Sequence, residues 1–381
     1  MKIEQTRWTP KDGWANGSVG SNLSDAQLVF LFGGTNVVTD APLTREVRDA
    51  YPEAYVFGCS TAGEICDTEV TDGALVATAV RLDATRIEHA EVSMSDVETS
   101  RNAGERLAQA LPAEGLVHVF VLSDGLHVNG SELVAGLTER LPSNVSITGG
   151  LSGDGDRFSQ TFVILNGSPK ADAVGVLGFY GAALKVGYAS LGGWDAFGPE
   201  RLITKSEGNV LYELDGRSAL QLYKTYLGEH AAGLPATGLL FPLSVRLNGD
   251  DIPVVRTILG IDEEAQSMTF AGDVPTGAYA RLMKANFDRL IDGAVGAAKG
   301  TYETVGSSSP ELAILISCVG RKLVLKQRVE EEVEGVREVL GDRTVLAGFY
   351  SYGEISPFTP SAKCELHNQT MTITTFSERA A

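Results

Sequence analysis

The chain has 381 residues, of which 43% are hydrophobic and 21% charged, and its formal net charge at pH 7 is −18. This length suits two domains with a large core that folds without a metal ion or disulfide. The acidic balance argues against nucleic acid or an anionic membrane as a partner, and favours a small molecule or another protein. The four scattered cysteines and the absence of long apolar segments indicate a bacterial-type cytoplasmic protein with reduced thiols.

The first part of the chain begins with a leader over residues 1–24. Apolar runs then predict strands at 28–33, 54–57 and 74–80, with a helix at 43–50 after the first strand. A glycine-rich turn of the form G-x-x-x-x-G-E-I occupies residues 58–65. The predicted order is therefore strand, helix, strand, glycine-rich turn, strand.

The same order returns near the end of the chain. Residues 348–355 form a second G-x-x-x-x-G-E-I turn. Strands are predicted at 312–320, 344–347 and 370–376, and apolar spacing predicts a helix over 329–340. We therefore expect Glu64 and Glu354 to occupy equivalent positions, with chance similarity between strand–helix sequences as the alternative.

A middle copy of this order is predicted from four segments, which are strands at 117–125, 145–153 and 161–165 and a helix at 131–141. A helix over 217–229 follows a run of glycine-broken strands, which predicts a domain boundary between residues 215 and 216. The predicted class is α/β, with α+β as the alternative. It has two domains, 25–215 and 216–381, built from repeated strand–helix–strand–strand units with glycine-rich turns.

Several of these segments resemble those of FIST proteins, a family named for F-box and intracellular signal transduction. Residues 348–357 resemble the family signature, and 317–321 and 366–371 resemble other parts of the FIST C-terminal domain. Segments 58–65, 123–125 and 148–154 are similar to the FIST N-terminal domain. Residues 25–215 and 216–381 are therefore expected to be the FIST N-terminal and C-terminal domains.

The resemblance implies a sensory role in signal transduction. Such a protein binds a small ligand and reports its occupancy to a histidine kinase, a diguanylate cyclase or phosphodiesterase, or a chemotaxis protein. In length and two-domain arrangement the chain also resembles a subset of the family that senses nitric oxide through haem.

The two glycine-rich turns supply the first candidate ligand-binding residues. Each turn places backbone N–H groups at a strand end, where ligands bind in many α/β folds. Ser60 and Glu64 lie on the first turn, and Tyr350, Tyr352 and Glu354 lie on the second. The alternative is that the glycines only form tight turns and that each glutamate caps neighbouring N–H groups.

A second group of candidates lies around the strand end at residue 318. Arg321 offers a bidentate partner for a ligand carboxylate, and it would also lower the pKa of the Cys318 thiol. His367 and Asn368 belong to a segment that the family resemblance covers. We predict that these residues and Glu354 surround a cavity for a small polar ligand, such as an amino acid or a carboxylate metabolite. Otherwise Cys318 is a small core residue and Arg321 a surface charge.

If haem b is the cofactor, an imidazole is expected to ligate its iron. His367 is one candidate, on a mixed strand face shared with Met371 and Ile373, and His127, just after a strand, is the other. We expect no catalytic activity, since no P-loop, G-x-S-x-G or H-E-x-x-H motif is present. The rival from another class is a hydrolase or isomerase that uses Cys318 or Glu354.

Overall fold

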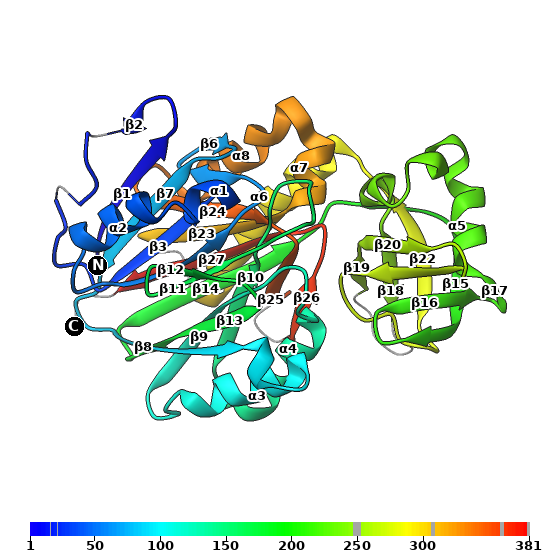
Figure 1. The fold of residues 1–381 in the computed structure, drawn as a ribbon, viewed down its shortest axis with the longest axis horizontal. Coiled ribbons are helices and arrows are strands. Elements are labelled where there is room, and N and C mark those ends of the chain that lie inside the picture. The colour runs from blue at the N-terminus through cyan, green and yellow to red at the C-terminus, as the bar shows by residue number, and fades with distance from the viewer. Residues whose placement is uncertain (16, 21, 247–252, 306–308, 359–361, 379–381) are drawn as a thin grey trace.

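The computed structural model describes residues 1–381 except 16, 21, 247–252, 306–308, 359–361 and 379–381. Three mixed sheets with flanking helices form a large body, and a fourth sheet forms a small domain beside it (Figure 1). The small domain is inserted between β14 (Leu184–Leu191) and α6 (Phe287–Val305). The predicted α/β class is confirmed, and no helix in the described ranges is long and apolar enough to cross a membrane.

The body contains three copies of one unit, so a middle copy is present as predicted. Each copy begins with an edge strand, a central strand, a helix and a strand parallel to the central one. It then has an exchanged strand, which pairs with a strand of another copy, and a return strand, which pairs antiparallel with the central strand. In that order the first copy is β1 (Lys2–Thr9), β3 (Leu28–Gly33), α2 (Ala41–Ala50), β4 (Tyr55–Ser60), β5 (Glu64–Cys66) and β7 (Leu75–Arg81). The second is β8 (Arg86–Ser93), β9 (Leu116–Ser123), α4 (Gly130–Arg140), β10 (Ser146–Leu151), β11 (Val163–Leu165) and β13 (Ala173–Tyr180). The third is β14, β23 (Leu312–Cys318), α8 (Val329–Leu340), β24 (Val345–Ser351), β25 (Gly353–Pro357) and β27 (Met371–Glu378). The last strand of the middle copy was predicted wrongly, because the segment 161–165 holds β11, which pairs with β4 of the first copy, and the strand equivalent to 74–80 is β13.

The exchanged strands interlock the three copies. Strand β5 of the first copy pairs with β24 of the third, β11 of the second pairs with β4 of the first, and β25 of the third pairs with β10 of the second. Within each copy the central strand pairs in parallel with the strand after the helix and antiparallel with the return strand. Each sheet of the body therefore contains strands from two copies.

The inner faces of the three sheets meet in one aromatic core. Phe32 of β3 lies against Phe349 of β24, with ring centroids 4.8 Å apart, and Phe30 of β3 lies 5.5 Å from Phe120 of β9. These side chains are at most 1% exposed. Because strands at the centre of such a body are buried on both faces, they appear in the sequence as continuous apolar runs.

The body contains further elements outside this common unit. They are β2 (Gly13–Trp14), α1 (Thr35–Val38), β6 (Glu69–Thr71), a 3-10 turn (Met94–Asp96), α3 (Ser100–Ala110), β12 (Ser168–Lys170), α7 (Val319–Leu325), a second 3-10 turn (Lys326–Arg328) and β26 (Cys364–His367). Asn129 is the N-cap residue of helix α4, and its side chain accepts hydrogen bonds from the backbone N–H groups of Ser131 and Glu132. This cap fixes the loop between β9 and α4, which contributes to the sites described below.

The small domain has its own apolar core. Its elements are β15 (Asp195–Glu207), β16 (Val210–Leu214), β17 (Arg217–Ser218), α5 (Ala219–Leu227), 3-10 turns at Gly228–Gly233 and Ala236–Leu240, β18 (Leu243–Arg246), β19 (Val254–Arg256), β20 (Ile258–Asp262), β21 (Ser267–Phe270) and β22 (Tyr279–Lys284).

The spatial division of the chain differs from the expected boundary at residues 215 and 216. That boundary lies in the turn between β16 and β17, inside the small domain. Helix α5, which suggested the boundary, packs on the same sheet as the strands before it. The expected leader over residues 1–24 contains β1, which pairs with β7 at the edge of the first sheet.

Candidate ligand site between the body and the small domain

The first glycine-rich turn connects β4 to the exchanged strand β5. Thr61 Oγ1 donates a hydrogen bond to Glu64 Oε1, and the backbone N–H of Ala74 donates to Glu64 Oε2 at 3.0 Å. Ser60 Oγ accepts a hydrogen bond from the backbone N–H of Phe162 at 2.9 Å. Ser60 and Glu64 are buried, and their polar atoms bond within the protein. Glu64 thus ties its turn to the start of the return strand.

The second turn has the same pattern around Glu354. Ser351 Oγ donates to Glu354 Oε1 at 2.6 Å, and both the backbone N–H and the hydroxyl of Thr370 donate to Oε2. The predicted equivalence of Glu64 and Glu354 is confirmed by these contacts. Burial raises the pKa of the Glu354 carboxyl to about 8 and that of Glu64 to about 7.

The raised pKa of Glu354 predicts a pH dependence of stability. In the folded protein the carboxyl holds its proton up to about pH 8, whereas in the unfolded chain it loses it near its ordinary pKa of 4.5. The free energy of unfolding should therefore fall as pH rises through this window, by at most about 1.4 kcal/mol per pH unit from this group. Glu354→Gln mimics the protonated acid, because its amide can donate to Ser351 while its oxygen accepts from Thr370. The variant should become progressively more stable than the wild type between pH 5 and 8 in urea titrations. A difference that does not change with pH would contradict the assignment.

Arg321 was expected to face a ligand cavity, and the structure shows that it does not. Its guanidinium is completely buried and forms an ion pair with Glu332, which is also completely buried. Its remaining hydrogen bonds go to the backbone carbonyls of Gly192 and Leu290. Tyr350, expected at the ligand site, donates its hydroxyl to Glu332 Oε1 at 2.7 Å. Both residues therefore belong to a buried polar network whose partners are within the protein.

The other candidates near the end of β23 do come together. Glu354 and His367 are cross-strand partners in β25 and β26, and the backbone N–H of Cys318 donates to the carbonyl of Thr370. Burial, aided by the nearby Glu354 carboxylate, raises the pKa of the Cys318 thiol well above its ordinary value. The net shift is opposite to the expected lowering, because the effect of burial outweighs the smaller lowering by the charge of Arg321.

Four buried polar atoms, one on Thr257 and three on residues 367–369, have no hydrogen-bond partner among the described residues. They are Thr257 Oγ1, His367 Nδ1, Asn368 Nδ2 and Gln369 Oε1. Thr257 belongs to the small domain, and its backbone N–H donates to Asn368 Oδ1 of the body at 3.3 Å. Buried polar atoms are nearly always hydrogen-bonded in native proteins, so these atoms call for a polar partner such as a water molecule or a ligand.

A cavity of about 510 Å³ lies between the body and the small domain. Helix α4 contributes Val134 and Ala135 to its wall, β26 contributes Leu366, and the small domain contributes Val254 and Arg256. Arg256 and Leu366 of this wall directly precede Thr257 and His367 in the sequence, and the four unsatisfied atoms themselves are not in the wall.

Arg256 is the buried charge in this wall. It is 6% exposed, and its Nε and Nη1 atoms donate to the backbone carbonyls of Asp273 and Leu366, both at 2.9 Å. It forms no ion pair with any residue in the described part of the chain. Burial lowers the pKa of its guanidinium to about 10, although the charges of Glu365 and Asp273 oppose this effect.

A smaller cavity of about 210 Å³ lies farther along the same junction. His127 and Tyr352, both predicted site residues, are in its wall with Phe270 of the small domain. The Tyr352 hydroxyl donates to Asp154, and its ring stacks on Phe158 with centroids 4.4 Å apart. The structure therefore separates the predicted residues. Ser60 and Glu64 lie at the first turn, and His127 and Tyr352 line this cavity. Cys318, Glu354, His367 and Asn368 lie near the end of β23, and Arg321 and Tyr350 belong to the buried network.

Neither predicted haem ligand has surroundings that fit haem. The His367 side chain is completely buried, its Nε2 bonds to the carbonyl of Ser356, and its ring lies 4.0 Å from that of Phe358. It belongs to β26 and does not share a strand with Met371 and Ile373 of β27, as had been expected. The cavity beside His127 is smaller than the roughly 300–1,000 Å³ usual for drug-sized ligands.

Comparisons with known proteins match most of the chain. A FIST N domain model matches residues 27–217, and a FIST C domain model matches residues 219–357. An uncharacterized protein of Methanocaldococcus jannaschii is 28% identical over 206 residues, which cover 50% of this chain and 38% of that protein. A cyanuric acid hydrolase from A. caulinodans aligns over 100% of this chain and 99% of its own, with 9% identity and a TM-score of 0.41. A second cyanuric acid hydrolase structure aligns over 78% of this chain and 100% of its own, with 10% identity and a TM-score of 0.18.

Proposed function

Because this chain belongs to the FIST family, whose domains are associated with signal-transduction sensing, we propose that it senses a small carboxylate-bearing ligand. The ligand binds in the 510 Å³ cavity between the body and the small domain. Its occupancy is relayed to a signalling partner such as a histidine kinase or a cyclic-di-GMP enzyme. The observation that carries the proposal is Arg256, a buried cation in the cavity wall that forms no ion pair with a described residue.

The energetics of a buried charge support an anionic ligand. A guanidinium removed from water loses solvation, and the backbone carbonyls and the nearby charges of Asp273 and Glu365 compensate only part of this loss, since the pKa of Arg256 stays lowered. A carboxylate beside Arg256 would restore the balance through charge-assisted hydrogen bonds. Asp273 and Glu365 also lie in the wall and suit an amino group on the same ligand. An amino acid or a related carboxylate metabolite is therefore the ligand class that the cavity favours.

The position of the cavity supports a relay of occupancy. Its wall combines α4 and β26 of the body with strands of the small domain, and the chain passes between the two parts at residues 192–194 and 285–286. A ligand that contacts both parts stabilises the arrangement in which they are close together. A partner protein that recognises this arrangement would respond to ligand binding.

The alternatives of haem binding and catalysis have less support. The surroundings of His367 and His127 do not suit haem, as described above. Cys318 is 2% exposed and its pKa is raised, so its thiol is a poor nucleophile. Glu354 is buried, with its oxygens bonded to Ser351 and Thr370.

Filling the cavity should abolish ligand binding without unfolding the protein. Ala135 lies in the cavity wall and is partly exposed, so Ala135→Phe should place a ring in the space that the ligand needs. Mass spectrometry of small molecules released from the purified wild type should identify a carboxylate, and titration calorimetry with that compound should show binding that Ala135→Phe loses. Arg256→Met should weaken the same binding by roughly 10- to 150-fold.

Ala110→Phe is the matched control, because it adds the same ring to an exposed position on α3 outside the cavity wall. It should bind the ligand like the wild type. If Ala135→Phe binds as tightly as the wild type, the ligand does not occupy this cavity and the proposal is wrong.

A further inference from the structure

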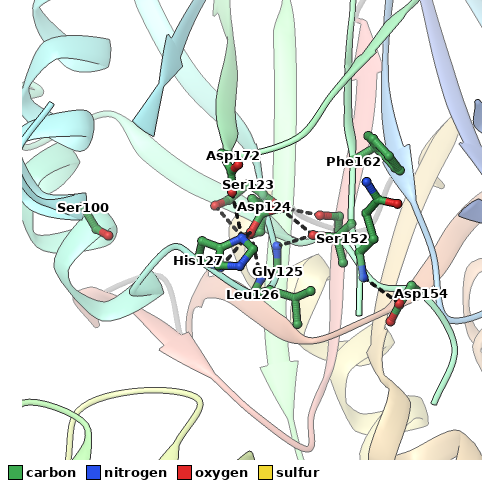
Figure 2. Close-up of polar contacts among 12 residues, drawn as sticks. Ser100, Ser123, Asp124, Gly125, Leu126, His127, Ser152, Asp154, Phe162 and Asp172 are labelled. Atoms are coloured by element: carbon green, nitrogen blue, oxygen red, sulfur yellow. Dashed lines mark hydrogen bonds and ion pairs between the residues drawn. The ribbon is translucent and has the colours of Figure 1, made fainter. Parts of the chain in front are cut away.

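Three side chains with metal-binding atoms meet at one end of the sheet that contains β9 and β13. Asp124 directly follows β9, Asp172 directly precedes the neighbouring strand β13, and His127 lies in the loop that leads to α4. The backbone N–H of Asp124 donates to the carbonyl of Ala173 at 2.9 Å, which holds the two strand ends together. Figure 2 shows the His127 ring beside both carboxylates.

From this arrangement we propose that Asp124, His127 and Asp172 bind a divalent transition-metal ion. One ligand atom from each residue lies within 4.8 Å of the other two. His127 Nδ1 lies 2.7 Å from Asp172 Oδ1 and 3.5 Å from Asp124 Oδ1. Zinc–nitrogen and zinc–oxygen bonds are about 2.0–2.2 Å long, so ligands around one ion lie about 3–3.5 Å apart. Small side-chain movements would bring the three atoms to this spacing.

The Asp124 carboxylate is already held in place for this role. It is buried, and its Oδ1 accepts hydrogen bonds from the backbone N–H groups of Leu126 at 2.9 Å and His127 at 2.7 Å. Its Oδ2 accepts from Thr161 Oγ1 at 2.6 Å. Outer contacts of this kind orient the carboxylate ligands of metal sites. Asp124 would thus be a rigid ligand, and the exposed His127 and Asp172 would close on the ion.

The charges at the cluster also favour a cation. In the chain as described, neither Asp124 nor Asp172 forms an ion pair with a lysine or arginine, and His127 is the partner of both. Two carboxylates beside one imidazole repel each other unless a positive charge is present. An imidazole ligand suits zinc, copper, iron or nickel better than calcium or magnesium, which prefer oxygen ligands.

The site would leave coordination positions open. The side chains of His127 and Asp172 are 64% and 55% exposed, so water can reach the ion. His127 also lies in the wall of the 210 Å³ cavity that extends to Tyr352. A small ligand in that cavity could therefore reach the metal directly.

Titration of the full chain with Zn²⁺ and with Mg²⁺ tests the proposal. The wild type should bind about one equivalent of Zn²⁺ by calorimetry, bind Mg²⁺ far more weakly, and melt at a higher temperature with Zn²⁺ present. His127→Ala and Asp172→Asn should each weaken Zn²⁺ binding by about 10- to 100-fold or more. Asp172→Asn is the sharper variant, because asparagine can still accept a hydrogen bond from His127 but is a poor metal ligand.

His89→Ala is the matched control, because His89 is an exposed histidine that stacks on Tyr55 away from this cluster. It should retain wild-type Zn²⁺ binding. The proposal fails if the wild type binds no Zn²⁺. It also fails if His127→Ala and Asp172→Asn bind Zn²⁺ as tightly as the wild type, since the cluster would then be only a surface hydrogen bond.

Discussion

Replacing Arg321 by Met is expected to lower the free energy of unfolding by about 3–5 kcal/mol. The substitution leaves the Glu332 carboxylate completely buried, with the hydroxyl groups of Ser317 and Tyr350 as its remaining donors among the described residues. It also removes the donors that satisfy the backbone carbonyls of Gly192 and Leu290. Urea denaturation monitored by circular dichroism measures this loss.

Two further variants test the physical reason. Arg321→Met combined with Glu332→Leu should recover much of the lost stability, because the unbalanced buried charge is then absent. Arg101→Met removes an exposed ion pair with Glu139 and should change stability by less than about 1 kcal/mol. If Arg321→Met leaves stability unchanged but abolishes ligand binding, the sequence-based assignment of Arg321 to the ligand site is correct after all.

Alanine at any of three equivalent glycines should prevent normal folding. The three are paired with central strands in the same way in each copy of the unit. An added Cβ at Gly58, Gly149 and Gly348 would lie 1.7, 1.8 and 1.9 Å from the carbonyl oxygens of Leu31, Val121 and Leu315. Because the obstacle is backbone inside a sheet, paired strands must separate, which should cost about 3 kcal/mol or more. The measurements are soluble yield and thermal melting of each variant.

Gly260→Ala provides the control for these three substitutions. Gly260 also lies in a strand, but an added Cβ would meet no atom within 4 Å, and its backbone conformation accepts alanine. Its melting temperature should stay close to that of the wild type. If one of the three equivalent glycines tolerates alanine as well as Gly260 does, the copies differ at that position.

The body of the fold could be predicted because its elements carry strong local signals. Buried strands such as residues 28–33 and 312–318 are continuous apolar runs, and helix 329–340 has clear apolar spacing. Strand β8 and the strands of the small domain alternate between exposed and buried residues or are interrupted by polar residues, so they give weaker signals. The exchange of strands between copies also leaves no mark in any one segment, because it depends on which sheet edge is nearest in space.

The candidate site could be predicted only in part. Glu354, His367 and Asn368 stand in segments with recognisable motifs, and the structure brings them together. Arg321 looked accessible because Glu332, its partner, is eleven residues away on another helix. Arg256 and Thr257 carry no motif, and their importance comes from the position of the small domain against β26.

The exchanged strands set the order in which the protein can complete its fold during synthesis. Strand β5 pairs with β24, and about 280 residues of chain lie between them. At 5–20 residues per second, a ribosome needs roughly 15–60 s to make that stretch. Throughout this time β5 exposes unpaired backbone groups that can pair with other chains. The sheet edge at β4 does the same until β11 has been synthesised. The nascent chain should therefore depend on protection by chaperones until its last third has left the ribosome.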